Sequence, residues 1–314
     1  MSARSPDPSS SSRHSEPSRA WKRSKPAALA TLAPGLYLVA TPIGNLADIS
    51  LRALEVLAKA DLVVCEDTRT TRKLLTAHGI AARLTAYHDH NAARVRPKLM
   101  KRLECGEAVA LVSDAGTPLI SDPGYKLVAA AAEANVTVTA VPGASAGLAA
   151  LTVSGLPSDR FLFAGFLPNR SGARRRALAE LAPIPASLVI YESARRLPAA
   201  LADMAEVLGP RPAAVARELT KLHEEVRRGT LPALAEHYQR AGPPKGELVV
   251  VIGPAGPDSA AAPDAEVLDA QLGAALRRAS LRDAVAAVAE ATGLPRRQVY
   301  ARALELAREA GDES

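Results

Sequence analysis

Serine, aspartate, threonine, glycine and proline gather in one stretch of the chain, residues 108–124, which reads AVALVSDAGTPLISDPG. Its first five residues are apolar and include two β-branched valines, which predicts a short strand buried on both faces. The loop that follows holds more turn-forming and hydrogen-bonding residues than a simple connection needs. Because open parallel sheets bind ligands beyond the carboxyl ends of their strands, the stretch favours a small-molecule site. A tightly turned structural loop is an equally good interpretation of these residues alone.

Two further loops of similar composition follow predicted strands: TPIGN comes after residues 36–40, and VPGASA comes after residues 136–140. Loops that leave the carboxyl ends of parallel strands meet at one edge of a sheet, so we expect all three to converge. None of them matches the G-x-G-x-x-G dinucleotide fingerprint or the Walker pattern with its lysine. They also contain few cations, and a neutral or zwitterionic adenosyl ligand therefore suits them better than a pyrophosphate.

The elements that must position these loops alternate between strand and helix, which predicts an α/β fold with mainly parallel sheets covered on both faces. A first α/β domain is expected over residues 34–155, and a hinge at 156–160 begins a second one over 156–254. A run of Pro, Gly, Ala and Asp predicts a linker at 255–264. The remainder, 265–314, has helical periodicity with a break at 292–295, which predicts a helix-turn-helix-like extension of two helices and a turn.

Composition limits the class of protein. The chain has 314 residues, of which 48% are hydrophobic, and this is enough apolar surface for two domains. No apolar run approaches the ~18 residues of a membrane span, and the amino terminus lacks the apolar core of a secretory signal. We therefore expect a soluble, cytoplasmic protein without a membrane partner. The two cysteines have no metal-ligand spacing and His223 has no second histidine nearby, so no metal is expected.

The net charge of +6 comes largely from the first 33 residues, which hold six Lys or Arg and two acids. This tail is rich in serine and proline and cannot bury enough apolar surface to order itself. We expect a dispensable disordered basic tail over residues 1–33, with a weak electrostatic contact to nucleic acid as the alternative.

Eight segments carry a resemblance to a known family. In order they read LYLVATPIGNLADISLRALEVL, ADLVVCEDTRTTRKLL, VALVSDAGTPLISDPG, VPGASA, FAGFLP, YESARRL, RELTKLHEE and GELVVVIG. They resemble the tetrapyrrole methylase superfamily, and within it the small-subunit ribosomal RNA methyltransferases that modify a cytidine ribose 2′-oxygen. The resemblance covers residues 35–253, and the carboxyl-terminal helices are similar to the helix-turn-helix extension of the same family. The TPIGN form of the first loop is similar to the RNA-modifying branch and argues against a porphyrinoid substrate.

The resemblance implies two α/β domains with the methyl donor, S-adenosyl-L-methionine, in the cleft between them, and a homodimer. It also implies that 16S ribosomal RNA or the small ribosomal subunit is the partner. The implied cofactor contacts come from the three loops: Pro42, Gly44, Ser113, Asp114, Ala115, Gly116, Thr117, Pro118, Pro142, Gly143, Ala144 and Ser145.

The implied reaction is an in-line displacement in which the ribose oxygen attacks the sulfonium methyl group. Positioning alone is worth roughly 7 to 11 kcal/mol in such a reaction, but the hydroxyl proton must still leave. Glu66 and Asp67 follow a predicted strand and are the candidate bases, with Arg69, helped by Arg72, as the partner of the developing anion. The alternative, slightly favoured for Asp67, is that this aspartate caps a helix and Arg69 merely pairs with it.

Cations of the second domain are candidate contacts to RNA phosphates. Residues 168–230 hold eleven Arg or Lys and seven Asp or Glu. A solvated helix face explains the run of three arginines at 174–176 equally well. The candidate contacts are Arg174, Arg195, Arg196, Arg217 and Lys221.

The carboxyl-terminal helices place Arg296 and Arg297 where a recognition helix begins, yet from residue 260 onward there are nine acids and seven cations. Docking on the body or on an RNA–protein assembly is therefore as good an interpretation as DNA binding. Two alternatives to the RNA methyltransferase stay open: a non-catalytic nucleic-acid-binding protein or regulator, and a tetrapyrrole C-methyltransferase.

Overall fold

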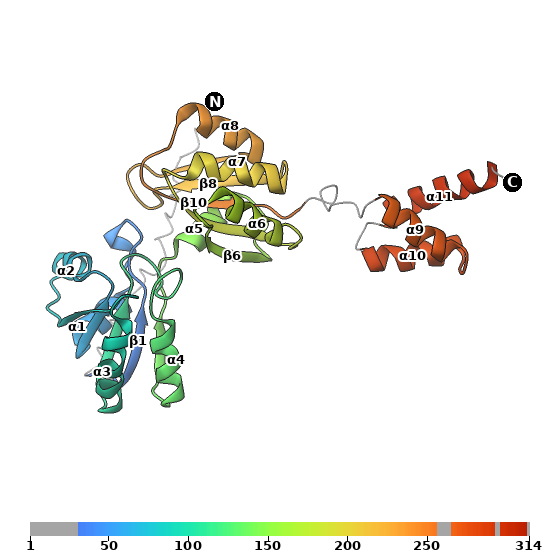
Figure 1. Cartoon of the computed structure of the whole chain (residues 1–314). Coiled ribbons are helices and arrows are strands. Elements are labelled where there is room, and N and C mark those ends of the chain that lie inside the picture. The colour runs from blue at the N-terminus through green and yellow to red at the C-terminus, as the bar shows by residue number, and fades with distance from the viewer. Residues whose placement is uncertain (1–30, 256–264, 293–295, 313–314) are drawn as a thin grey trace, which may run out of the picture.

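The structure, a computed structural model, describes residues 31–255, 265–292 and 296–312 (Figure 1). It consists of two five-stranded sheets with their helices and a helical carboxyl-terminal part. Nearly all of the predicted tail and most of the predicted linker lie outside the described residues. No described helix combines the length and the apolar character that a membrane crossing demands.

The first sheet has the strand order β3-β2-β4-β1-β5, and all of its pairings are parallel, as predicted. All five residues of the central strand β4 are buried, so the predicted strand with two covered faces is confirmed. The strands are β1 (Gly35–Val39), β2 (Leu62–Cys65), β3 (Leu84–Ala86), β4 (Ala108–Val112) and β5 (Val138–Val141).

Helices cover both faces of this sheet. Residues of α1 (Leu51–Lys59) and α2 (Thr68–Ala77) pack on one face. The short 3-10 helix η1 (Leu46–Asp48) precedes α1 in the chain. Residues of α3 (Ala92–Glu104) and α4 (Tyr125–Glu133) pack on the other face. Each helix follows a strand and returns to the next one, which is the crossover connection that a parallel sheet requires.

The second sheet has the order β6-β7-β10-β8-β9, and only its β6–β7 pairing is parallel. The pairings β7–β10, β10–β8 and β8–β9 are antiparallel, so the prediction of a mainly parallel second sheet is wrong. The alternation of strands and helices predicts crossovers, but it does not show that β10 inserts between β7 and β8. The strands are β6 (Phe161–Phe166), β7 (Ser187–Ser193), β8 (Pro212–Arg217), β9 (Glu225–Thr230) and β10 (Glu247–Ile252).

One face of the second sheet packs on α6 (Ser171–Leu181), α7 (Leu197–Leu208) and α8 (Leu231–Ala241). The other face is covered by α5 (Ala146–Ser154), although this helix directly follows the last strand of the first sheet (Figure 1). Leu151 of α5 shares a core with Val189 of β7 and Val251 of β10. Helix α5 therefore packs with the second sheet, although it belongs to the first of the two predicted domains, which ends at residue 155.

The carboxyl-terminal part has three described helices, α9 (Ala265–Leu276), α10 (Leu281–Thr292) and α11 (Arg296–Asp312), where two were predicted. Helix α10 begins as a new helix after α9 because Ser280 caps it: its hydroxyl accepts the backbone N–H of Asp283 at 3.2 Å. These helices share a core of their own, which includes Leu272, Val288 and Val299. Most of the predicted break at 292–295 lies outside the described residues, between Thr292 at the end of α10 and Arg296 at the start of α11.

Candidate active site

The three loops of the first domain converge, as predicted. Thr41 and Gly116 exchange backbone hydrogen bonds of 2.9 and 3.0 Å, which ties the loop after β1 to the loop after β4. The Thr117 hydroxyl donates to the backbone oxygen of Ala144 at 3.0 Å, which ties the loop after β4 to the loop after β5. Gly143 rests so closely on Ala40 that an added Cβ would come within 2.9 Å of the alanine Cβ. The loops thus form one connected rim at the carboxyl edge of the sheet.

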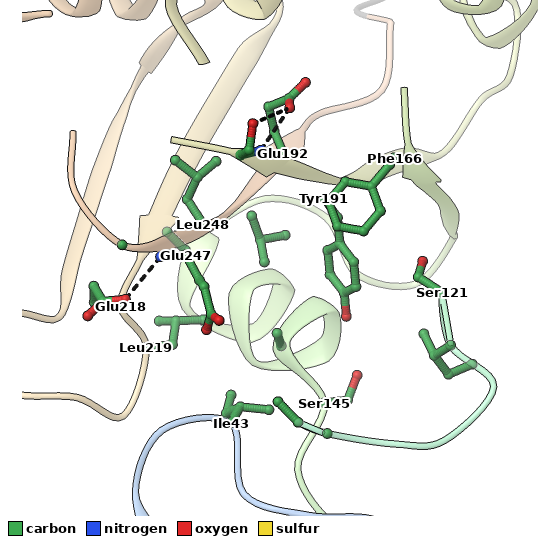
Figure 2. A pocket seen from close by; sticks show the side chains of 18 of the residues that line it. Ile43, Ser121, Ser145, Phe166, Tyr191, Glu192, Glu218, Leu219, Glu247 and Leu248 are labelled. Carbon is green, nitrogen blue, oxygen red and sulfur yellow. Dashed lines mark hydrogen bonds between the residues drawn. The ribbon is translucent and has the colours of Figure 1, made fainter. Parts of the chain in front are cut away.

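A cleft of about 440 Å³ lies between this rim and the second sheet (Figure 2). Five of the predicted cofactor positions line it: Asp114, Ala115, Gly116, Thr117 and Ser145. Ser113 and Ala144 lie behind this lining, where Ser113 donates its hydroxyl to the Gly116 oxygen and Ala144 accepts from Thr117. The other predicted positions, Pro42, Gly44, Pro118, Pro142 and Gly143, belong to the same loops but are not among the lining residues.

The second domain supplies an aromatic and apolar wall that sequence reasoning missed. The ring of Tyr191 lies edge-on to Phe163 and Phe166, with centroid distances of 4.9 and 5.6 Å. Its hydroxyl accepts the backbone N–H of Gly147 at 3.2 Å, and Figure 2 shows it directed toward Ser145. Leu219 and Leu248 complete the wall. The quoted segments FAGFLP and YESARRL contain these aromatic residues, but their order in the sequence does not indicate that they meet at one cleft.

Carboxylates dominate the polar lining. Glu218 and Glu247 accept hydrogen bonds from Lys221, at 2.8 and 3.0 Å, so the one cation among the lining residues is already neutralised. The aliphatic stem of Lys221 packs on Gly44, where an added Cβ would lie 2.5 Å from the lysine Cγ. In the part of the chain with described coordinates, no cluster of histidine, cysteine and acidic side chains has the makings of a metal site. The acids that line the cleft are Asp114, Asp122, Glu192, Glu218 and Glu247.

Asp122 has the most altered protonation of these acids. Burial, followed by the charge of Glu66, raises the pKa of Asp122 to about 6, although a hydrogen bond with Ser113 opposes the shift. Burial also raises the pKa of Asp114. Asp122 was quoted in the predicted loop only as a turn residue. The pKa of Asp122 depends on burial and on the charge of Glu66, which follows β2, and the order of residues in the sequence reveals neither.

The predicted catalytic residues lie outside the cleft lining. Asp67 caps α2: its carboxylate accepts the Arg69 backbone N–H at 2.8 Å and pairs with the Arg69 guanidinium at 2.8 Å. These hydrogen bonds lower the pKa of Asp67 to about 2, which makes it a very poor base, and the alternative reading as a cap is confirmed. Glu66 is exposed, and Arg69 is turned to Asp67.

Most of the predicted RNA contacts are engaged in ion pairs. The prediction for Arg174 is wrong, because its side chain is only 4% exposed and pairs with the equally buried Asp203 of α7. Arg196 pairs with Glu192 and donates to the Leu167 backbone oxygen, and Arg217 pairs with Glu225. Of the five candidates, Arg195 is the exposed one. The run of three arginines points in different directions around α6, so its first member faces the core.

The fold and the interdomain cleft together define a class. The chain belongs to the tetrapyrrole methylase family: the family model described as Tetrapyrrole (Corrin/Porphyrin) Methylases matches residues 35–235. A second model, described as RsmI C-terminal HTH domain, matches residues 261–307. Solved structures of the same fold include a diphthine synthase, with a TM-score of 0.56 at 18% identity over 69% of this chain and 89% of that one. A cobalt precorrin-4 methyltransferase has a TM-score of 0.53 at 18% identity over 69% of this chain and 94% of that one.

Within the family, two curated relatives share the name Ribosomal RNA small subunit methyltransferase I. The protein of that name from Mesorhizobium japonicum is 54% identical over 90% of this chain and 95% of its own length. The one from Erythrobacter litoralis is 56% identical over 88% of this chain and 96% of its own length. The resemblance stated from the quoted segments is thereby confirmed.

Proposed function

We propose that this chain is an S-adenosylmethionine-dependent methyltransferase that methylates the ribose 2′-oxygen of a cytidine in 16S ribosomal RNA. One observation carries the proposal. The three loops that sequence reasoning selected are hydrogen-bonded into the rim of one cleft. The relatives that bear the rRNA methyltransferase name support the choice of substrate, since they match the chain over both domains.

The cleft has the size and chemistry that the donor requires. Its volume of about 440 Å³ is within the range of small-molecule pockets. Tyr191 and Phe166 offer aromatic surface to an adenine, and the carboxylates offer negative charge to a ligand with ammonium and sulfonium groups. Gly116, with φ +85°, allows the backbone of the rim to come close to a ligand. When bound, the donor supplies an electrophilic methyl group.

The residues of the chain then have two tasks: to orient the reactants and to take up a proton. The ribose 2′-oxygen forms the new bond to the methyl carbon, the carbon–sulfur bond breaks with its electron pair left on sulfur, and the hydroxyl proton leaves. We assign that proton to Asp122, which lines the cleft and is mostly ionised above pH 6. Asp122 replaces Glu66 and Asp67 in this role.

Methyl transfer to isolated small subunits tests the proposed function. The full chain is incubated with methyl-labelled S-adenosylmethionine and with either small ribosomal subunits or free 16S RNA, and the RNA is digested to nucleosides. We expect label in 2′-O-methylcytidine. Label in a tetrapyrrole offered in a parallel reaction would contradict the proposal, and so would RNA binding with no label in any nucleoside. The implied homodimer stays a prediction. Sedimentation of the full chain would measure its oligomeric state.

A further inference from the structure

A region of the first domain has a strong excess of positive charge that the proposed function has not used. Residues 68–102, which include α2 and most of α3, hold nine arginines and lysines but one acid, Asp89. The second domain is different, because its cations at 168–230 are accompanied by seven acids. The charge balance makes this segment, and not the first domain as a whole, a more attractive surface for a polyanion than residues 168–230.

A shallow groove runs along the exposed side of α2, lined by Arg69, Arg72, Lys73, Thr76 and Ala77. These positions are three or four residues apart and so share one face of the helix. The opposite face is buried through Thr71, Leu74 and Leu75. The helix, TRTTRKLLTA, contains no acidic residue that could neutralise the groove.

The cations of the groove are open to solvent. The Arg69 side chain is 85% exposed even though it pairs with Asp67. Arg72 and Lys73 are exposed and have no ion-pair partner within the described ranges of the chain. By contrast, Arg174, Arg217 and Lys221 of the second domain each hold an acid of their own. Paired cations attract a phosphate weakly, so these three residues are poorly suited to the role first predicted for them.

The groove is connected to the cleft. The helix α2 begins at the carboxyl end of β2, the sheet edge at which the three loops meet. The backbone N–H of its cap, Asp67, donates to the carboxylate of Asp114 at 3.1 Å, and Asp114 lines the cleft. One hydrogen bond therefore separates the cap of the cationic helix from the proposed donor site.

We propose that the α2 groove binds phosphodiester groups of the RNA substrate, through Arg72 and Lys73 with Arg69 beside them. The proposal rests on the proposed function for the identity of the polyanion. The acids of the cleft repel phosphates, whereas the groove next to them attracts them. A strand held in this way has its charged backbone on α2 and its sugar edge at the cleft.

The salt dependence of RNA binding tests the groove. Affinity of the full chain for in vitro transcribed 16S RNA is measured from about 50 to 200 mM salt, for the native chain and for Arg72→Gln/Lys73→Gln. Each lost phosphate contact reduces the slope of log K against log salt by about 0.7 to 0.9, so we expect a reduction of about 1.4 to 1.8. Arg160→Gln/Arg176→Gln removes the same charge from exposed positions of the second domain and is expected to leave the slope unchanged.

Two results would contradict RNA binding by the groove. One is an unchanged slope in Arg72→Gln/Lys73→Gln, and the other is an equal reduction in the control pair, which would reflect net charge only. The exchange Arg72→Lys/Lys73→Arg retains both charges and is expected to retain the slope, which separates lost contacts from a disturbed helix. Donor affinity, measured by calorimetry, is expected to stay native in all variants. A native chain that binds RNA but transfers no methyl group contradicts the proposed function, while the slopes still decide the groove.

Discussion

Two aspartates of the first domain, Asp67 and Asp122, have opposite protonation chemistry because their surroundings differ. Asp67 is fully hydrogen-bonded by Arg69 at the start of α2, and those bonds hold its pKa at about 2. Asp122 is half-buried in the cleft, and burial and Glu66 raise its pKa to about 6. A base is most effective when its pKa lies near the working pH, so the environment selects Asp122.

We expect Asp122→Asn to lower kcat for methyl transfer by about 10² to 10⁴, because the amide cannot accept the proton. In the native chain kcat/KM should fall as pH drops below about 6, since protonation of Asp122 removes the acceptor. The charges of Glu66 and Asp114 also act on this carboxyl and raise its pKa. Steady-state rates from pH 5 to 8 check both points.

Asp159→Asn, at an exposed position between α5 and β6, is the matched control and should leave the rate and its pH profile native. If Asp122→Asn kept the fall of kcat/KM at acidic pH seen in the native chain, the titrating group would be another residue.

Asp203 illustrates a carboxylate with a structural role. Its carboxylate pairs with Arg174 and Arg175 of α6. Burial acts to raise the pKa of Asp203, but hydrogen bonds from Arg175, Ser171 and Arg174 outweigh this effect, so the pKa is lowered. We expect Asp203→Ala to lower the free energy of unfolding by about 3 to 5 kcal/mol, because it leaves the buried Arg174 unpaired. Urea denaturation at neutral pH measures this loss.

The control for Asp203 is Glu206→Ala, which removes the exposed second partner of Arg175 and is expected to cost about 0 to 1 kcal/mol. Since the folded-state pKa of Asp203 is lowered, its contribution to stability is present above its unfolded pKa and disappears as pH falls through the folded value. The difference between native chain and Asp203→Ala should therefore narrow in acid. A constant difference down to low pH would contradict the ion pair.

At the scale of elements, the loops show how far sequence reasoning reaches. The order of strands and helices was enough to predict a parallel first sheet and three loops on one edge, because crossover connections leave few topologies. It was not enough for the second sheet, in which β10 separates β7 and β8 and reverses the direction of pairing. Asp122 and Tyr191 were missed for a related reason: their neighbours come from other strands.

The loop after β4 depends on Gly116. Its φ of +85° lies in the left-handed region, and an added Cβ would lie 3.3 Å from Cγ2 of Ile43. We expect Gly116→Val to cost about 1 to 2 kcal/mol in backbone strain and to weaken donor binding at least tenfold, because the rim of the cleft must shift. Calorimetry with S-adenosylmethionine, together with thermal unfolding, measures the two effects.

Gly172→Val, in α6, provides the comparison, because an added Cβ there meets no atom within 4 Å and the φ is ordinary. It should leave donor affinity native. Native donor affinity in Gly116→Val would show that the loop after β4 does not form the donor site.

At the scale of the whole molecule, α5 links the two domains, because it continues the chain of the first domain but packs on the sheet of the second. It follows β5 in sequence, but Ala150 and Leu151 pack on the second sheet. Arg228 of β9 secures its end by donating to the backbone oxygens of Val153 and Ser154. The first turn of the same helix contributes Ser145 and Ala146 to the cleft. Any change in the angle between the domains is therefore transmitted to the proposed donor site.

We expect a fragment of residues 145–255 to be soluble and a fragment of residues 156–255 to aggregate. The shorter fragment lacks α5 and exposes the apolar face formed by Val189, Val249 and Val251. Size-exclusion chromatography and binding of a hydrophobic dye compare the two. Equal solubility would place the division between the domains at residue 155 after all.

The carboxylates that line the cleft also bear on how the enzyme of the proposed function finishes its cycle. Glu218 and Glu247 already neutralise Lys221, and Glu192 pairs with Arg196, which leaves Asp114 and Asp122 to give the cavity an excess of negative charge. A sulfonium donor arrives with a positive charge at the reacting atom and departs as an uncharged thioether. The same side chains therefore attract the fresh donor more strongly than the spent one, and we expect S-adenosylhomocysteine to bind more weakly than S-adenosylmethionine in paired calorimetric titrations. The loss of the positive charge on sulfur would then favour release of the product after each methyl transfer. Tighter binding of S-adenosylhomocysteine than of S-adenosylmethionine would refute this.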